Sequence, residues 1–150
     1  MPRIYNRIYD KIQARLGELQ GMKSYLAQKA INSKLYYLDN YATYDYKFYD
    51  KIVCNKFRAI LGGNVRIMCT GSAPIAVDVL NFLKVCFCCP ILEGYGQTES
   101  TAASCVTMPN DATAGHVGGP ITCVKVRLRD IPEMGYTSSD LPHPRGEICF

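Results

Sequence analysis

The nine residues Ile91–Glu99, Ile-Leu-Glu-Gly-Tyr-Gly-Gln-Thr-Glu, decide the fold of this 150-residue chain. A short apolar run that ends at Glu93 predicts a buried strand, and Gly94-Tyr95-Gly96 follows it directly. Two glycines let the backbone turn sharply and approach a ligand closely, and they leave a flat face of the aromatic ring free. Thr98 and Glu99 then supply a hydroxyl and a carboxylate just past the carboxyl end of the strand, where open α/β sheets bind ligands.

These side chains together suit a nucleotide whose phosphates carry Mg²⁺. The metal ion is usually held by one or two carboxylates together with phosphate oxygens. A tight strand-to-loop turn with a surface glutamate explains the same nine residues equally well, because a single short motif carries a real risk of a false positive. The interpretation therefore depends on the rest of the chain.

A second glycine turn lies upstream of the first. Val65–Cys69 is a short apolar run that predicts a strand, and Thr70-Gly71-Ser72-Ala73-Pro74 follows it as a turn. Asp78–Val85 then predicts a helix, and Ile91–Leu92 a second strand. Consecutive strand, helix and strand in one sheet imply a parallel, right-handed crossover. Both glycine turns then lie at the same edge of the sheet, where they can clamp a flat ring; two ordinary turns between strand and helix are the alternative.

The first segment of the chain is helical in pattern. Apolar residues recur at Ile4, Ile8, Ile12 and Leu16 with basic residues on another face, which is typical of an amphipathic helix. The expected elements are a helix from Pro2 to Gly17 or Gly21, a helix over Met22–Asn32, loop or irregular helix over Tyr36–Tyr49, and a helix over Tyr49–Leu61 that Gly62-Gly63 ends.

The net charge of +4 is concentrated in this same segment. Up to Ile60 there are eleven Lys and Arg against five Asp and Glu, and nine of the eleven tyrosines lie there. Such a basic, Tyr-rich surface suits nucleic acid or anionic lipid, whereas a solvated helical surface with rings packed along it is the simpler explanation. The composition is globular. No apolar run reaches the roughly 20 residues of a membrane-spanning helix, and no secretory signal is visible.

The cysteines and histidines do not follow a zinc-binding pattern. Cys86, Cys88 and Cys89 form a Cys-x-Cys-Cys cluster, whereas zinc sites pair Cys-x2–4-Cys with a second pair at a fixed distance. Without a secretory signal, reduced and buried thiols are expected for the eight cysteines. His116 lies in a Gly-rich loop, where we expect it to form local hydrogen bonds rather than act as a catalyst.

The pattern beyond Glu99 favours β-structure. Cys123–Leu128 alternates apolar with basic residues, as does a strand with one solvated face, and Gly146–Phe150 begins a further strand. We therefore divide the chain into a helical, basic and Tyr-rich segment (1–61), a strand–helix–strand segment with the nucleotide site (62–120) and the start of a small β-rich subdomain (121–150).

Several ordered motifs run along the chain, and Glu93–Glu99 is the most specific of them. The others are Pro2–Asp10, Gly62-Gly63 before Val65–Met68, Thr70–Pro74, Thr113–Gly118 and Pro144–Ile148. Together they resemble the middle part of a long-chain fatty acid–CoA ligase of the AMP-forming adenylating superfamily, over nearly all 150 residues. The resemblance implies an α/β fold, part of the large N-terminal domain of such an enzyme.

The resemblance also implies a two-step reaction. A fatty carboxylate attacks the α-phosphorus of ATP and pyrophosphate leaves, after which the thiol of coenzyme A attacks the acyl-adenylate. A carboxylate is a poor electrophile, and the anhydride with AMP supplies a good leaving group. The protein contributes positioning and stabilisation of charge on the phosphoryl oxygens.

Residue roles follow from the same resemblance. Gly71-Ser72-Ala73, with Pro74 after them, and Gly94-Tyr95-Gly96 would sandwich adenine, with Tyr95 stacked on the base. Thr98 would hydrogen-bond the α-phosphate, and Glu99 would coordinate Mg²⁺, which offsets charge at the reacting phosphate. Gln97 and Glu93 match the motif and take supporting roles.

Some features of the superfamily have no match in this sequence. These are the phosphate loop with its lysine, the ribose-binding aspartate, the catalytic lysine of the small C-terminal domain and a membrane anchor. We therefore expect a fragment without ligase activity of its own. The full-length protein is expected to be intracellular and bound to the endoplasmic reticulum, mitochondrial outer membrane or peroxisomal membrane. Its partners would be fatty acid, ATP and coenzyme A, and not nucleic acid.

Two other function classes stay open at this point. A nucleotide-binding module without chemistry would keep the adenine contacts, so that Tyr95→Ala should weaken its binding of adenine nucleotides. An interaction protein that uses the basic, Tyr-rich segment would bind with an affinity that falls steeply with salt.

Overall fold

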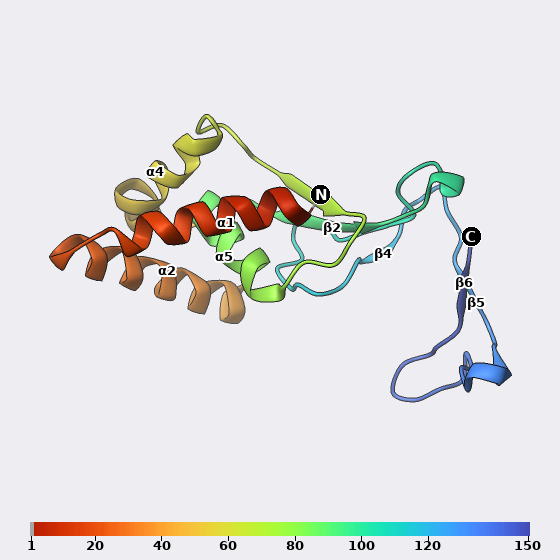
Figure 1. Ribbon diagram of the computed structural model, residues 1–150. Helices are drawn as coiled ribbons and strands as arrows, with labels where there is room; N and C mark the ends of the chain where they lie inside the picture. Colours follow the sequence, from red (N-terminus) through yellow and green to blue (C-terminus); the bar gives the residue numbers. More distant parts are fainter. Residues whose placement is uncertain (1) are drawn as a thin grey trace.

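The computed structural model describes residues 2–150 and arranges them as a group of helices against a four-stranded sheet, with a hairpin that extends away from both (Figure 1). The helices are α1 (Pro2–Gly17), α2 (Gly21–Tyr41), α3 (Lys47–Tyr49), α4 (Asn55–Arg58) and α5 (Val77–Phe87). The strands are β1 (Met68–Gly71), β2 (Ile91–Tyr95), β3 (Cys105–Val106), β4 (Gly119–Pro120), β5 (Arg127–Arg129) and β6 (Glu147–Cys149).

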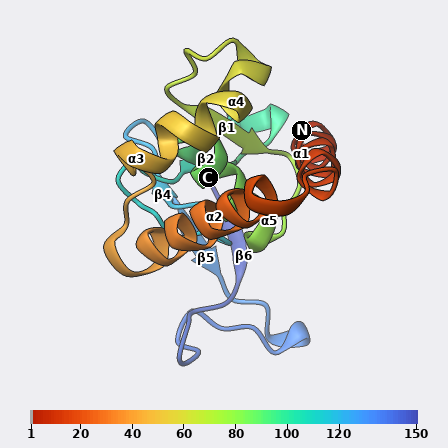
Figure 2. The ribbon, with the colours of Figure 1, turned by 90° about the vertical axis from the view of Figure 1, so that its left-hand side faces the viewer.

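The predicted parallel crossover is confirmed. Strands β1 and β2 are parallel neighbours, and α5 connects them. Strands β3 and β4 continue the sheet in antiparallel fashion, in the order β1-β2-β3-β4, while β5 and β6 pair only with each other. Figure 2 shows this hairpin projecting below the helices and the sheet. The fold is therefore mixed α/β, with a parallel pair at its centre.

Helix α5 lies at the centre of the hydrophobic core. Leu80 and Leu83 are fully buried on it, and Phe82 and Phe87 are nearly so. A helix that is apolar on most sides must be covered on most sides. Helices α1 and α2 pack on it, and Ile91 of β2 joins the same core cluster. The apolar run that predicted this helix thus also accounts for its central place.

Helix α1 has the predicted extent and is fastened to the sheet. Ile12 is buried on its inner side, and the hydroxyl of Tyr5 donates a hydrogen bond of 2.6 Å to the carbonyl oxygen of Cys69. Cys69 belongs to β1, and this bond therefore connects the first helix directly to the parallel pair.

Helix α2 is longer than predicted, and the prediction of loop or irregular helix is wrong for its last turns. The helix runs on to Tyr41 because Ala27, Ile31, Lys34 and Leu38 form one continuous buried stripe. A lysine within that stripe hides the helical period in the sequence. The tyrosines beyond it pack on one another, with Tyr46 and Tyr49 stacked at 5.1 Å between ring centroids.

The stretch predicted as a helix, Tyr49–Leu61, is helical but does not form one regular helix. A short α-turn leads into a π-helical stretch over Asp50–Cys54, which is followed by α4 and a 3₁₀ turn over Ala59–Leu61. Gly62, with φ of 81°, ends the series. π-Helical turns are rare and occur frequently at functional sites.

The strand boundaries differ modestly from the predicted ones. Strand β1 begins at Met68 rather than Val65, because pairing with β2 starts at the Met68–Ile91 register and residues 64–67 have no strand partner. Strand β2 continues from Leu92 to Tyr95, and β5 pairs only from Arg127. Pairing partners, which the local pattern does not reveal, set these limits.

The eight cysteines are free thiols, as predicted, but they are not all buried. Cys54, Cys86 and Cys89 are buried, whereas Cys69 and Cys123 are exposed. Among residues 2–150, no helix is both long and apolar enough to cross a membrane.

Candidate functional site

A cleft opens where the parallel strands β1 and β2 end. Gly71 lies directly opposite Gly94 in the register of the two strands, so the turns that follow them are neighbours, as predicted. The cleft has a volume of about 350 Å³, within the range of small-molecule sites. Its lining comprises Thr70–Ile75, Glu93–Gly96 and Gly115–Val117. The structure thus brings the two predicted glycine turns together and adds a third wall.

Close backbone contacts require the glycines at this edge of the sheet. A Cβ atom on Gly71 would lie 2.9 Å from the carbonyl oxygen of Gly94, closer than real Cβ contacts. A Cβ on Gly96 would lie 1.5 Å from the carbonyl oxygen of Ala102. Ser72, with φ of 71°, turns the chain out of β1. The glycines therefore keep the two turns close and leave bare backbone along the cleft.

The third wall is held in place by Glu93. This buried residue of β2 accepts a hydrogen bond of 2.8 Å from the backbone N–H of Gly115 through its Oε1 atom. Its own backbone N–H donates to the hydroxyl of Thr107 at 2.9 Å. Glu93 thus connects the strand to the loop that carries Gly115 and His116.

Lys84 fastens the same loop from the other side and was missed by sequence reasoning. It lies on α5 with only 1% of its surface exposed, and its Nζ donates to the carbonyl oxygens of Ala112 and Thr113 at 3.0 Å each. Burial lowers the pKa of Lys84, and the nearby charges of Glu93 and Asp111 act in the opposite direction. A lysine within the otherwise apolar run of α5 is the sequence feature that could have indicated this buried contact.

His116 forms local hydrogen bonds, as predicted. Its Nε2 lies 2.7 Å from the hydroxyl of Thr113, and its Nδ1 accepts the backbone N–H of Gly118 at 3.1 Å. The carboxylate of Asp111 lies 3.3 Å from Nε2. These contacts fix the shape of the loop that lines the cleft.

Tyr95 lines the cleft and is half-buried. Its ring is stacked on that of Phe150, with 5.9 Å between centroids and 28° between planes. Its hydroxyl accepts a hydrogen bond of 2.9 Å from the side-chain amide of Gln97. Gln97 therefore fixes the position of the Tyr95 hydroxyl.

Thr98 and Glu99 lie just past the end of β2, as the sequence predicts, in a short 3₁₀ turn over Thr98–Ser100. Both side chains are exposed. Glu99 lines a second hollow together with Lys125 and Phe150, and neither Thr98 nor Glu99 lines the cleft of the glycine turns. The structure therefore places the predicted phosphate and metal residues beside the cleft rather than inside it.

Thr70 is a lining residue that the sequence reasoning treated only as part of a turn. It is 6% exposed, and its hydroxyl has no hydrogen-bond partner among residues 2–150. Buried polar groups are nearly always hydrogen-bonded. Thr70 therefore places a buried hydroxyl without a protein partner in the wall of the cleft.

Comparison with known proteins shows the family to which the chain belongs. The family model described as AMP-binding enzyme matches residues 1–150. The chain belongs to the AMP-binding enzyme family.

The relatives of this AMP-binding family member include proteins named as a long chain acyl-CoA synthetase and a long-chain-fatty-acid–CoA ligase. It is 45% identical over 149 residues to the protein named long chain acyl-CoA synthetase 7, peroxisomal, of Arabidopsis thaliana, covering 99% of this chain and 21% of the relative. It is 42% identical over 150 residues to long-chain-fatty-acid–CoA ligase 5 of Rattus norvegicus, again covering 21% of the relative. The resemblance to long-chain fatty acid–CoA ligases is thus confirmed, and the chain spans about a fifth of the length of these relatives.

The fold is also that of a solved adenylation domain. The adenylation domain of the carboxylate reductase from Mycobacterium chelonae superposes with a TM-score of 0.61 at 25% identity, over 98% of this chain and 18% of that one. The predicted fold class, part of the large domain of an adenylate-forming enzyme, is therefore confirmed for this member of the AMP-binding family.

Proposed function

We propose that this chain forms the adenine side of the nucleotide site in a long-chain fatty acid–CoA ligase. The protein that contains it would activate a fatty acid with ATP, through an acyl-adenylate, and transfer the acyl group to coenzyme A. The observation that carries the proposal is the pairing of Gly71 with Gly94, which holds two bare turns around an open cleft. Sequence identity to proteins named as long-chain acyl-CoA synthetase or ligase supports a long-chain fatty acid as the carboxylic acid substrate.

The cleft suits a purine base. Gly71-Ser72-Ala73, with Pro74, would form one wall and Gly94-Tyr95-Gly96 the other, and Tyr95 would stack on the base. Close approach is supported by the absence of side chains at Gly71 and Gly94, and the buried, unpartnered hydroxyl of Thr70 lies in the same wall of the cleft. Flat rings bind through stacking with a few placed polar groups, as in most small-molecule sites.

The phosphates would extend from this cleft toward Thr98 and Glu99. We propose that Thr98 hydrogen-bonds the α-phosphate and that Glu99 is the carboxylate ligand of Mg²⁺. The donor set fits, since Mg²⁺ takes one or two carboxylates with phosphate oxygens and water, and Glu99 is exposed and outside the ion pairs found among residues 2–150. When bound, Mg²⁺ offsets negative charge on the phosphates; the chain itself positions the nucleotide.

The same proposal assigns a separate role to each of the three segments of the chain. Residues 1–61 would support the site as a helical layer, residues 62–120 would carry the nucleotide contacts, and residues 121–150 would begin a small β-rich subdomain. Coenzyme A and the fatty acid are proposed as further substrates. Association of the protein with a peroxisomal, mitochondrial outer or endoplasmic reticulum membrane is proposed as well, and a relative named as peroxisomal supports the first of these.

Substitution of Tyr95 tests the proposal directly. Base–aromatic stacking is worth about 1–3 kcal/mol per base, so Tyr95→Ala should weaken AMP binding by about fivefold to 150-fold. Tyr95→Phe keeps the ring and loses only the hydrogen bond from Gln97, and it should bind AMP nearly as well as the parent. Calorimetric titration with AMP measures the affinity of the parent and of both variants. It uses the protein in the longest form in which its source makes it. Equal affinity of the alanine variant and the parent would refute the stacking role.

A further inference from the structure

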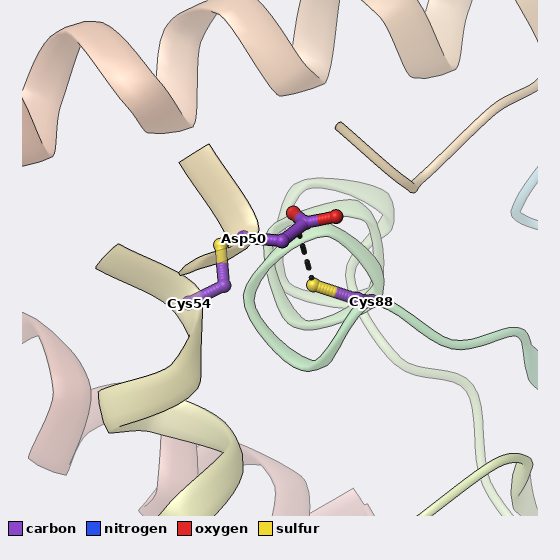
Figure 3. Close-up of side chains that lie close together, drawn as sticks. All are labelled: Asp50, Cys54 and Cys88. Atoms are coloured by element: carbon purple, nitrogen blue, oxygen red, sulfur yellow. Dashed lines mark hydrogen bonds between the residues drawn. The ribbon is translucent and has the colours of Figure 1, made fainter. Parts of the chain in front are cut away.

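A second group of reactive side chains lies in the interior, away from the cleft. Lys34 of α2, Asp50 and Cys54 of the π-helical stretch, and Cys88 at the end of α5 come from three separate elements and meet at one point. Single ligand atoms of Asp50, Cys54 and Cys88 all lie within 4.8 Å of one another. Figure 3 shows Asp50 and Cys88 facing each other, with the sulfur of Cys54 alongside.

Lys34 occupies the centre of this group. Its side chain is 1% exposed, and its ammonium forms an ion pair with Asp50. The same Nζ lies 3.0 Å from the sulfur of Cys88 and 3.5 Å from that of Cys54. The thiol of Cys88 in turn donates to Oδ1 of Asp50 at 3.2 Å. All four side chains are therefore held by one another in a fixed arrangement.

The cluster is unsuited to a metal ion in spite of its ligand types. Zinc needs its ligands to converge on one point, usually four in a tetrahedron. Here Lys34 already contacts Asp50, Cys54 and Cys88. An incoming cation would have to displace a buried ammonium, and burying or freeing such a charge without its partner is costly.

The electrostatics of the cluster act on both thiols. The ammonium of Lys34 lies within 3.5 Å of each sulfur, and its positive charge favours the anionic form of either thiol. Lys34 itself stays charged, because the hydrogen bond to Asp50 and the neighbouring sulfurs outweigh burial and raise its pKa. Thiolate, not thiol, is the reactive form of cysteine.

The two cysteines differ in their exposure to solvent. Cys88 is half-buried at the left-handed turn that ends α5, with φ of 54°, whereas Cys54 is 1% exposed. An oxidant can therefore reach Cys88 first, and Cys54 lies behind it as a resolving thiol. Redox-sensitive cysteines are typically accessible and placed next to a resolving cysteine.

We propose that Cys54 and Cys88 form a reversible disulfide when the protein meets a peroxide. The sulfur of Cys88 attacks one peroxide oxygen, the O–O bond breaks, and the released hydroxide takes the thiol proton to give water and a sulfenic acid. The sulfur of Cys54 then attacks that sulfenic sulfur, the S–O bond breaks, and hydroxide leaves with the proton of Cys54 as a second water. Two thiols are oxidised and one peroxide is reduced, and a dithiol reverses the change.

The disulfide would act on the site through the chain. It would join the π-helical stretch to the turn that precedes β2, because Cys88 is followed by Cys89, Pro90 and then Ile91, the first residue of β2. It would also remove both sulfur contacts of Lys34 and leave it with Asp50 alone. This inference concerns residues outside the cleft and does not rest on the function proposed above.

Peptide mass spectrometry of the peroxide-treated protein, in the longest form in which its source makes it, tests the proposal. We expect a cross-linked pair of peptides containing Cys54 and Cys88, lighter by two hydrogens than their sum and separated again by dithiothreitol. In Cys54→Ser we expect a sulfenic acid on Cys88 that dimedone traps. The Cys123→Ser variant is the matched control, because Cys123 is exposed and is not a member of the cluster, and it should cross-link like the parent.

Three results would overturn the proposal. The first is oxidation of the exposed Cys69 and Cys123 while Cys54 and Cys88 stay reduced. The second is over-oxidation of Cys88 in the parent with no cross-link to Cys54. The third is a zinc ion that copurifies in equal amount with the protein and is lost in both Cys54→Ser and Cys88→Ser. Native-state melting of each variant, measured alongside, identifies any that fail to fold, and for those the cross-link is scored in the parent and in Cys123→Ser.

Discussion

Replacement of Gly71 by alanine should distort the cleft, because the added methyl group would push against the neighbouring strand of the sheet. The new Cβ would lie 2.9 Å from the carbonyl oxygen of Gly94 and 3.7 Å from its carbonyl carbon. Both are backbone atoms of the neighbouring strand, and no flexible side chain can move away. The ends of β1 and β2 must therefore separate by a few tenths of an ångström, at the one register position that holds the two turns together.

The expected cost follows from that contact. Extra methyl groups in well-packed positions typically destabilise a protein by about 1–3 kcal/mol. Gly119→Ala is the matched control, because Gly119 also lies in the sheet, has no positive φ, and no atom lies within 4 Å of its Cβ position. We expect the control to change the free energy of unfolding by about 0.5 kcal/mol or less. Because the turns form the proposed base-binding walls, Gly71→Ala should also weaken AMP binding, and the control should not.

Urea unfolding and calorimetric AMP titration of the two variants measure these effects. We predict that Gly71→Ala loses stability and AMP affinity and that Gly119→Ala loses neither. Equal free energies of unfolding for Gly71→Ala and Gly119→Ala would refute the claim that the close pairing with Gly94 requires a glycine. A destabilised Gly71→Ala that binds AMP normally would instead separate the pairing from the nucleotide site.

Two further predictions concern a buried hydroxyl and a buried ion pair. Thr70→Val removes a hydroxyl without a partner among residues 2–150, so the free energy of unfolding should stay the same or rise. The free energy of AMP binding should become less favourable by about 0.5–1.5 kcal/mol if the base uses that hydroxyl. Unchanged AMP affinity in the titration would rule out the contact. Burial alone would raise the pKa of Asp50, but Lys34 lowers it below 3.8. The ion pair therefore stabilises the fold above pH 3.8 and is lost as the pH falls below it. Asp50→Asn should lower the free energy of unfolding by about 3–5 kcal/mol at neutral pH, because it leaves the buried Lys34 without its partner. It should also remove the loss of stability in acid that the ion pair causes. Unfolding curves of Asp50→Asn that keep the pH dependence of the parent would contradict this prediction.

The parallel pair and its two turns could be predicted because their signals are local. The apolar run before Glu93, the run before Thr70 and the apolar helix between them are contiguous in sequence. Parallel pairing then follows from topology, and the adjacency of Gly71 and Gly94 follows from parallel pairing. Each step needs only short-range patterns and one general rule of sheet geometry.

Buried lysines explain most of what sequence reasoning did not reach. Lys34 interrupts the apolar stripe of α2, so the helix was predicted to end early, and Lys84 was passed over within the apolar α5. Each lysine is buried because distant groups satisfy it: Asp50 and Cys88 for the first, two loop carbonyls for the second. Partners this far along the chain leave no periodic signal. The contact between Glu93 and Gly115 was hidden for the same reason.

Exchange of labelled pyrophosphate into ATP tests the central claim most directly, because it reports acyl-adenylate formation without coenzyme A. The measurement uses the protein in the longest form in which its source makes it, with Mg²⁺ and a panel of carboxylic acids. We predict exchange that depends on a long-chain fatty acid such as hexadecanoate and that falls in Tyr95→Ala and in Glu99→Gln. Exchange supported only by amino acids or aromatic acids, or exchange unaffected by both substitutions, would contradict the account.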